Sequence, residues 1–183
     1  MDVEMPDKYD PNIYSHWPGK EPEKPDISVK IIPRSRWEAD PPQEAKLVPN
    51  TLPVTCVYST WLFGLREIFW DDEPHCRRAI RRIQRFYMRE KSQPDTPYSF
   101  IITSDGLVYE GRGWKYKPAV KTKHSCIDVA FAPKSGVKSD RAMMMKMMDA
   151  GFQLVYYGME EGLIDKGYVS MKREVDEEET FAW

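Results

Sequence analysis

Histidine and cysteine are both scarce in this chain, with three of each among 183 residues. The cysteines, Cys56, Cys76 and Cys126, are far apart and odd in number, which argues against the dense disulfide framework of small secreted domains. We therefore expect three reduced thiols that act as small hydrophobic side chains. His75 adjoins Cys76 and His124 lies two residues before Cys126, but neither spacing is that of a standard zinc site.

The sequence also lacks a long hydrophobic run. Its most apolar window, residues 61–70, contains Arg66 and Glu67, whereas a membrane-spanning helix needs about 20 apolar residues. Acidic residues interrupt the first 25 positions, where a signal peptide would need a continuous apolar segment. We expect neither segment in this chain, which leaves two locations open: inside the cell, or in the soluble part of a longer, membrane-anchored product.

An excess of charge of one sign is missing as well. The formal net charge is -2, which gives the chain no overall attraction to nucleic acid or to anionic lipid. We therefore expect no nucleic-acid partner, and any binding must come from local sites.

Two parts of the chain differ in composition, which suggests one arm and one domain. Residues 1–27 hold five prolines among acidic residues and lysines, a composition that cannot bury enough apolar surface to fold, so we expect a disordered, proline-rich acidic arm. Residues 28–183 have the length of a single globular domain.

Two helices are predicted from capping residues and apolar periodicity. Asp72 and Pro74 favour a helix start, and apolar residues at steps of three and four extend the helix over residues 74–91. A second, methionine-rich helix of about 19 residues is expected between a Ser139 cap and Gly158. The outer face of the first helix carries six arginines: Arg77, Arg78, Arg81, Arg82, Arg85 and Arg89. This face is either simply solvated or binds an anionic partner.

Strands are predicted between and around these helices. Residues 54–61 alternate as in a strand, Asp105-Gly106 favours a hairpin between residues 98–103 and 107–109, and residues 127–131 and 168–171 supply further strands. This order predicts a mixed α/β fold: a mostly parallel central sheet of about five strands with helices on both faces.

Three phrases resemble a known family. They are Ile31-Ile-Pro-Arg-Ser-Arg-Trp37, Val108-Tyr-Glu-Gly-Arg-Gly-Trp114 and the helix segment over residues 80–88. They resemble the peptidoglycan recognition protein (PGRP) family, whose fold is that of zinc-dependent N-acetylmuramoyl-L-alanine amidases. Within the family, the chain resembles in character the insect long-form, LA-type members, which resemble regulators rather than enzymes.

The resemblance implies a catalytic site that has lost its metal ligands. Catalytic members use two histidines and a cysteine to hold zinc, and a tyrosine to stabilise the oxyanion. In this chain the ligand positions align with Val57, Lys172 and Thr180, and the tyrosine aligns with Tyr98. We therefore expect no metal, no cofactor and no catalytic residues.

The resemblance also implies a degenerate groove for muramyl peptides. Its candidate contacts are Asp95, Tyr98, Arg112, Trp114 and His124. His124 aligns near an arginine that binds the diaminopimelate carboxylate in some insect members, and a histidine holds a carboxylate less firmly than a bidentate guanidinium does. Trp114 has an alternative role, filling space beneath the groove.

Two functions follow from this resemblance and a third is disfavoured. The first is a non-catalytic receptor or regulator in innate immune signalling that binds bacterial peptidoglycan fragments. The alternative is a protein-interaction module that modulates other immune receptors or adaptors without binding peptidoglycan. An active zinc amidase is the least favoured function.

Overall fold

A computed structural model describes residues 29–62, 72–134 and 140–173. The predicted 1–27 arm, the Ser139 cap and the acidic residues after Arg173 lie outside the described residues. The described elements, in chain order, are β1 (Ile31–Ile32), a short 3-10 helix (Glu44–Lys46), β2 (Val54–Trp61), α1 (Glu73–Glu90), β3 (Phe100–Thr103), β4 (Val108–Glu110), β5 (Cys126–Ala132), α2 (Arg141–Glu160) and β6 (Ile164–Arg173).

One sheet forms the centre of the molecule, in the order β1-β4-β3-β5-β2-β6. Only β3 and β4 pair antiparallel, and every other neighbouring pair is parallel. The predicted mixed, mostly parallel sheet is confirmed. It has six strands rather than about five, because the two-residue β1 adds a short edge strand beside β4.

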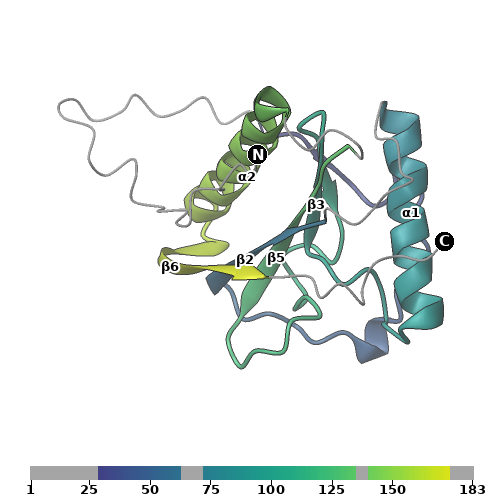
Figure 1. The fold of residues 1–183 in the computed structure, drawn as a ribbon. Helices are drawn as coiled ribbons and strands as arrows, with labels where there is room; N and C mark the ends of the chain where they lie inside the picture. The colour runs from purple at the N-terminus through teal and green to yellow at the C-terminus, as the bar shows by residue number, and fades with distance from the viewer. Residues whose placement is uncertain (1–28, 63–71, 135–139, 174–183) are drawn as a thin grey trace.

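The helices cover opposite faces of the sheet, as Figure 1 shows. On one face, Ile80 and Ile83 of α1 pack with Ile101 and Ala130 in a first core cluster. On the other, Met147 and Leu154 of α2 belong to a second cluster, together with strand residues from that face. Since alternate side chains of a strand point to opposite faces, membership of a cluster shows which face a residue occupies.

The hairpin between β3 and β4 forms at the predicted turn. Gly106 has a φ of 79°, a left-handed conformation that glycine adopts without steric cost. The Asp105 carboxylate accepts hydrogen bonds from the Thr103 hydroxyl and from the backbone N–H of Leu107 at 3.1 Å. These contacts fix the turn and the strand register.

Both helices begin at an aspartate side chain. The Asp72 carboxylate accepts from the backbone N–H of His75 at 2.9 Å, and α1 ends one residue before the predicted end. For α2 the cap is Asp140, which accepts from the N–H of Met143 at 3.0 Å. No described helix is long and apolar enough to cross a membrane.

The predicted end of the second helix at Gly158 is wrong. α2 continues to Glu160, and Gly162, with a φ of 70°, provides the turn that follows. Gly158 lies inside the helix. A glycine is needed at this position because a Cβ there would come within 2.8 Å of the Trp114 ring and 2.7 Å of Ile164. The glycine marks close packing of α2 on the sheet rather than a helix terminus.

The three cysteines are free and buried, as expected for small hydrophobic side chains. Burial raises the pKa of the Cys76 thiol to about 12 and that of Cys126 to about 12. Both thiols therefore stay protonated at neutral pH and behave as core residues.

Candidate functional site

Asp95 belongs to an internal hydrogen-bond network. One carboxylate oxygen accepts from Arg34 at 2.7 Å, and the other accepts from Arg34 at 3.2 Å and from the Gln84 side chain of α1 at 2.8 Å. The side chain is 1% exposed. Both oxygens are thus used to join the Arg34 turn to α1.

Arg112 has a similar internal role. Its guanidinium donates to the Thr96 carbonyl at 2.7 Å, to the Lys117 carbonyl at 3.0 Å and to the Gln93 side chain at 3.0 Å. Burial lowers its pKa, and nearby Asp95 opposes this shift. Arg112 and Asp95 together hold the loop that leads to Tyr98.

Trp114 and His124 lie apart from this network. Trp114 stacks at a tilt on Phe100, with ring centroids 4.7 Å apart, and packs against the cluster on the α2 face. This position favours the space-filling role considered for it. His124 is exposed, and its backbone N–H donates to the Thr122 hydroxyl at 3.1 Å in the loop before β5.

The structure does not bring Val57 and Lys172 together with Tyr98. Val57 belongs to the α2-face cluster, and Lys172 is the register partner of Ser59, two residues along β2, so both side chains point to the α2 face. Tyr98 belongs to the cluster on the α1 face. Thr180 lies outside the described residues.

Tyr98 is enclosed by protein on the α1 face. It is 1% exposed, and its hydroxyl lies 3.3 Å from the Tyr87 hydroxyl of α1. Burial raises the Tyr98 pKa well above its usual value, and Tyr87 adds to this shift. The Tyr98 hydroxyl is therefore a neutral group engaged with α1.

A buried carboxylate lies close enough to Tyr98 to contribute to that pKa shift. Asp128 of β5 is fully buried, and its two oxygens accept from the Thr60 hydroxyl at 2.8 Å and from the Arg173 guanidinium at 3.0 Å. Thr60 and Arg173 are register partners on β2 and β6, and Asp128 pairs with Tyr58, so these side chains share the α1 face. The sequence did not predict this cluster. Its one signal was an aspartate inside the otherwise apolar run Cys126–Ala132.

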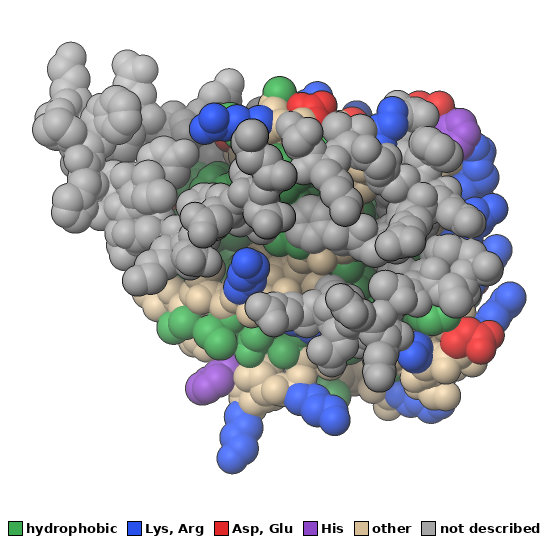
Figure 2. Space-filling model, viewed as in Figure 1, with side chains coloured by type: hydrophobic (Ala, Val, Ile, Leu, Met, Phe, Trp, Pro, Cys, Tyr) green, Lys and Arg blue, Asp and Glu red, His purple; other side chains and the backbone are tan. Residues whose placement is uncertain are grey.

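Part of the α1 face extends to the edge strand. Val169 and Met171 of β6 are 57% and 42% exposed there, and half-buried Tyr58 lies beside Met171 in the register. We call Tyr58, Val169 and Met171 the β2–β6 surface. Figure 2 shows hydrophobic side chains at the surface near this edge of the sheet. Exposed apolar side chains grouped on one strip are typical of a binding surface.

The side chains beside Tyr98 do not fit a zinc ion. They offer one carboxylate, already paired with a guanidinium, and a threonine hydroxyl, whereas catalytic zinc sites use three ligands from histidine, cysteine and carboxylate. Across the described residues no group of three such side chains could hold a metal ion. No metal-assisted step can therefore be built from this cluster.

Comparison with known proteins gives a consistent assignment, although no protein-family model matches the chain. Peptidoglycan-recognition protein 3 from Holotrichia diomphalia is 30% identical over 142 residues, which cover 75% of this chain and 71% of that protein. The structure is similar to that of Drosophila PGRP-LB with a TM-score of 0.68, at 24% identity and covering 79% of this chain and 82% of that one.

A third similar protein was solved with a ligand. Peptidoglycan recognition protein-LE, in complex with tracheal cytotoxin, a monomeric diaminopimelic acid-type peptidoglycan, has a TM-score of 0.63 and 27% identity, covering 78% of this chain and 81% of that one. Sequence similarity over most of both chains and a shared fold agree with the phrases quoted above. The chain belongs to the peptidoglycan recognition protein family.

Proposed function

We propose that this protein is a non-catalytic receptor or regulator in innate immune signalling, which holds a peptidoglycan fragment on the β2–β6 surface without hydrolysing it. One observation carries the non-catalytic part: the buried Asp128 carboxylate beside Tyr98 is paired with the Arg173 guanidinium. Family membership, and the ligand of the similar LE protein, support the choice of a peptidoglycan fragment.

The Arg173–Asp128 pair and the burial of Tyr98 both oppose metal-assisted hydrolysis. The guanidinium brings a positive charge to the place where a divalent cation would need anionic or neutral ligands. In addition, the Tyr98 hydroxyl is buried and lies 3.3 Å from the Tyr87 hydroxyl, so protein separates it from a substrate oxyanion. Binding without chemistry remains compatible with both features.

Binding would use the exposed part of the same face. Tyr58, Val169 and Met171 offer apolar and aromatic contact to a sugar ring or to the aliphatic part of a stem peptide. The positive charge of Arg173, which is 24% exposed, attracts the carboxylates of such a peptide. In this proposal His124 lies at the rim, while Asp95 and Arg112 hold the Tyr98 loop in place.

Calorimetry tests this function directly. We expect the purified protein to bind a muramyl tripeptide or pentapeptide saturably, with no release of peptide when zinc is added. Met171→Asp should weaken binding at least tenfold, because it places a carboxylate on the β2–β6 surface. Met145→Asp is the matched control, since Met145 is 62% exposed on α2 and should bind as the unmodified protein does.

Each part of the proposal has its own contradicting result. Stoichiometric zinc together with released peptide would overturn the non-catalytic part. Absence of saturable binding to either peptide would overturn the receptor part and favour the alternative, a module that modulates other immune receptors. Equal loss in the two methionine variants would contradict the assignment to the β2–β6 surface.

A further inference from the structure

The outer face of α1 carries its positive charge in two distinct groups. Three arginines are engaged within the molecule: Arg81 pairs with Glu38, Arg85 pairs with Asp40 at 2.8 Å, and Arg77 donates to the Arg36 carbonyl at 3.2 Å. The other three, Arg78, Arg82 and Arg89, are exposed and make no hydrogen bond or ion pair with any residue in the described ranges. Internal pairing therefore explains only part of the arginine content.

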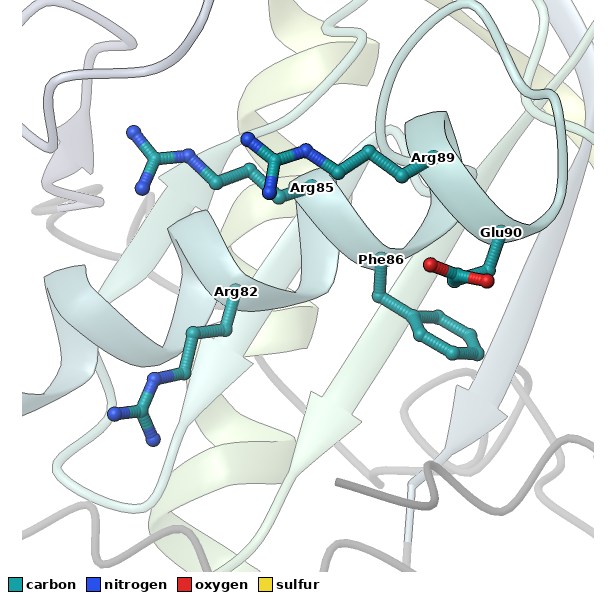
Figure 3. A pocket seen from close by; sticks show the side chains of 5 residues that line it. All are labelled: Arg82, Arg85, Phe86, Arg89 and Glu90. Carbon is teal, nitrogen blue, oxygen red and sulfur yellow. The ribbon is translucent and has the colours of Figure 1, made fainter.

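Arg82 and Arg89 border a small hollow with a half-buried aromatic side chain. Arg82, Arg85, Phe86, Arg89 and Glu90 line this hollow, whose volume is about 240 Å³. In Figure 3, Arg85 and Arg89 extend in the same direction, Arg82 extends away from them, and Phe86 lies beside Glu90. An apolar side chain can enter such a hollow while anionic groups meet the arginines around it.

The spacing of Arg82 and Arg89, the two arginines that border the hollow, sets the spacing of the groups they would bind. They are seven residues apart, which is about 10 Å along a helix that rises 1.5 Å per residue. Four residues of an extended peptide span about 13 Å, and its side chains two and four positions apart lie on the same face. Carboxylates four positions apart would therefore both face the helix, and the length of the arginine side chains, with Arg82 extending away from Arg89, covers the difference from the backbone spacing. Each guanidinium can bind a carboxylate with two hydrogen bonds.

The arginines on the outer face of α1 also repel one another when nothing is bound. Arg78 and Arg82, and likewise Arg85 and Arg89, are four residues apart, and like charges at this spacing destabilise a helix. Arg85 is neutralised by Asp40, while Arg89 lies near enough to lower the Asp40 pKa without pairing. Acidic groups placed against Arg82 and Arg89 would relieve this repulsion.

We propose that this surface, defined by Arg82, Phe86 and Arg89, binds an extended acidic segment of a partner protein, with an apolar side chain seated over Phe86. Nucleic acid fits less well. Glu90 lines the same hollow, and its carboxylate would repel the phosphate backbone of a nucleic acid, while the Lys91 ammonium lies 5.9 Å from the centroid of the single aromatic ring there.

Other parts of the molecule support a protein partner over a lipid surface. The large hydrophobic side chains that are exposed among the described residues lie outside α1, so this helix offers nothing to insert into a membrane. Lys and Arg side chains gather along the side of Figure 2 where α1 lies in Figure 1, while the whole chain has a net charge of -2. The attraction is thus local and suited to a short acidic segment.

Fluorescence anisotropy with defined peptides tests the proposal. The probe is a labelled ten-residue peptide with glutamates four positions apart and a leucine midway between them, so that all three side chains share one face of an extended peptide, and the comparison peptides replace the glutamates by glutamine or the leucine by serine. We expect saturable binding that weakens with salt, a loss of at least tenfold with the glutamine peptide, and a loss of about threefold with the serine peptide.

Charge-matched variants locate the binding. Arg82→Glu with Arg89→Glu should weaken peptide binding at least tenfold, whereas Lys166→Glu with Lys172→Glu makes the same change in net charge on exposed positions of β6 and should have no effect. Circular dichroism would verify that both variants fold. Equal loss in the two variants, or tighter binding of single-stranded DNA or heparin than of the acidic peptide, would overturn the proposal.

Discussion

Asp128 illustrates how one residue sets the chemistry of the α1 face. A fully buried carboxylate is costly unless it is paired, and here the Thr60 hydroxyl and the Arg173 guanidinium both donate to it. The arginine is partly exposed, so solvent screens the pair on one side. The interaction keeps an acidic group beside Tyr98 neutralised without a metal.

Replacement of Arg173 tests the strength of this pair. We expect Arg173→Met to lower the free energy of unfolding by about 2 kcal/mol, less than for a fully enclosed pair because Arg173 is partly solvated. Adding Asp128→Asn to that variant should recover part of the loss, since no buried charge is then left. Urea unfolding at neutral pH measures both.

A surface arginine provides the comparison for that variant. Arg36 pairs with Glu73 at 3.0 Å, but its side chain is 51% exposed, so Arg36→Met should cost less than about 1 kcal/mol. An equal cost for the two arginine substitutions would contradict the role assigned to Arg173.

At the scale of elements, α2 is positioned by two glycines, which lack a side chain, as well as by its apolar face. Gly158 lets the helix approach Trp114 and Ile164, and at Gly151 a Cβ would lie 2.9 Å from the Phe131 ring. α2 thus packs closely on the face that carries Val57 and Lys172, opposite the face with the Tyr98 cluster.

In Gly158→Ala, helix propensity and packing act on stability in opposite directions. Alanine should gain about 1 kcal/mol of helix propensity, but overpacking of a dense interior costs about 1–3 kcal/mol. Because the clash involves ring and aliphatic carbons at 2.7–2.8 Å, we expect net destabilisation. Thermal unfolding measures it, with Ala142→Gly at an exposed α2 position reporting the propensity contribution alone. A rise in Tm for Gly158→Ala would contradict this expectation, because it would show that Trp114 and Ile164 can shift to accommodate the added methyl group.

Across the whole molecule, carboxylate–arginine pairs join the N-terminal turn to α1. Glu38 pairs with Arg81 and Asp40 pairs with Arg85. The Arg85 hydrogen bond is the main cause that lowers the Asp40 pKa, while partial burial acts in the opposite direction. Stability should therefore depend on pH through these carboxylates.

The sign of this dependence follows from the lowered Asp40 pKa. A carboxyl whose pKa is lower in the folded state stabilises it above the unfolded pKa, near about 4, and loses that contribution as the pH falls through the folded value. We expect Asp40→Asn to be less stable than the unmodified protein at pH 7, with the difference shrinking below about pH 4. Urea unfolding from pH 7 to pH 3 measures this. A difference that is constant over that range would contradict it.

Much of the fold was predictable because the signals were local. The caps and periodicity of α1, the Asp105-Gly106 turn and the apolar strands depend on neighbours in the sequence. Gly158 was misread because its reason is contact with Trp114 and Ile164, which are distant in the chain or follow the helix. The candidate site was predicted less well, since the facing of Val57 and Lys172 depends on strand register.

The sequence by itself determined the family, the alternation of helices and strands, and the arginine content of α1, because these are properties of residue order and local periodicity. Only the tertiary structure decided which arginines are paired, that Asp95 and Arg112 are engaged internally, and that Asp128, Thr60 and Arg173 meet beside Tyr98. These contacts join residues up to 68 positions apart, and their geometry is fixed by sheet register and helix packing, which no local pattern encodes.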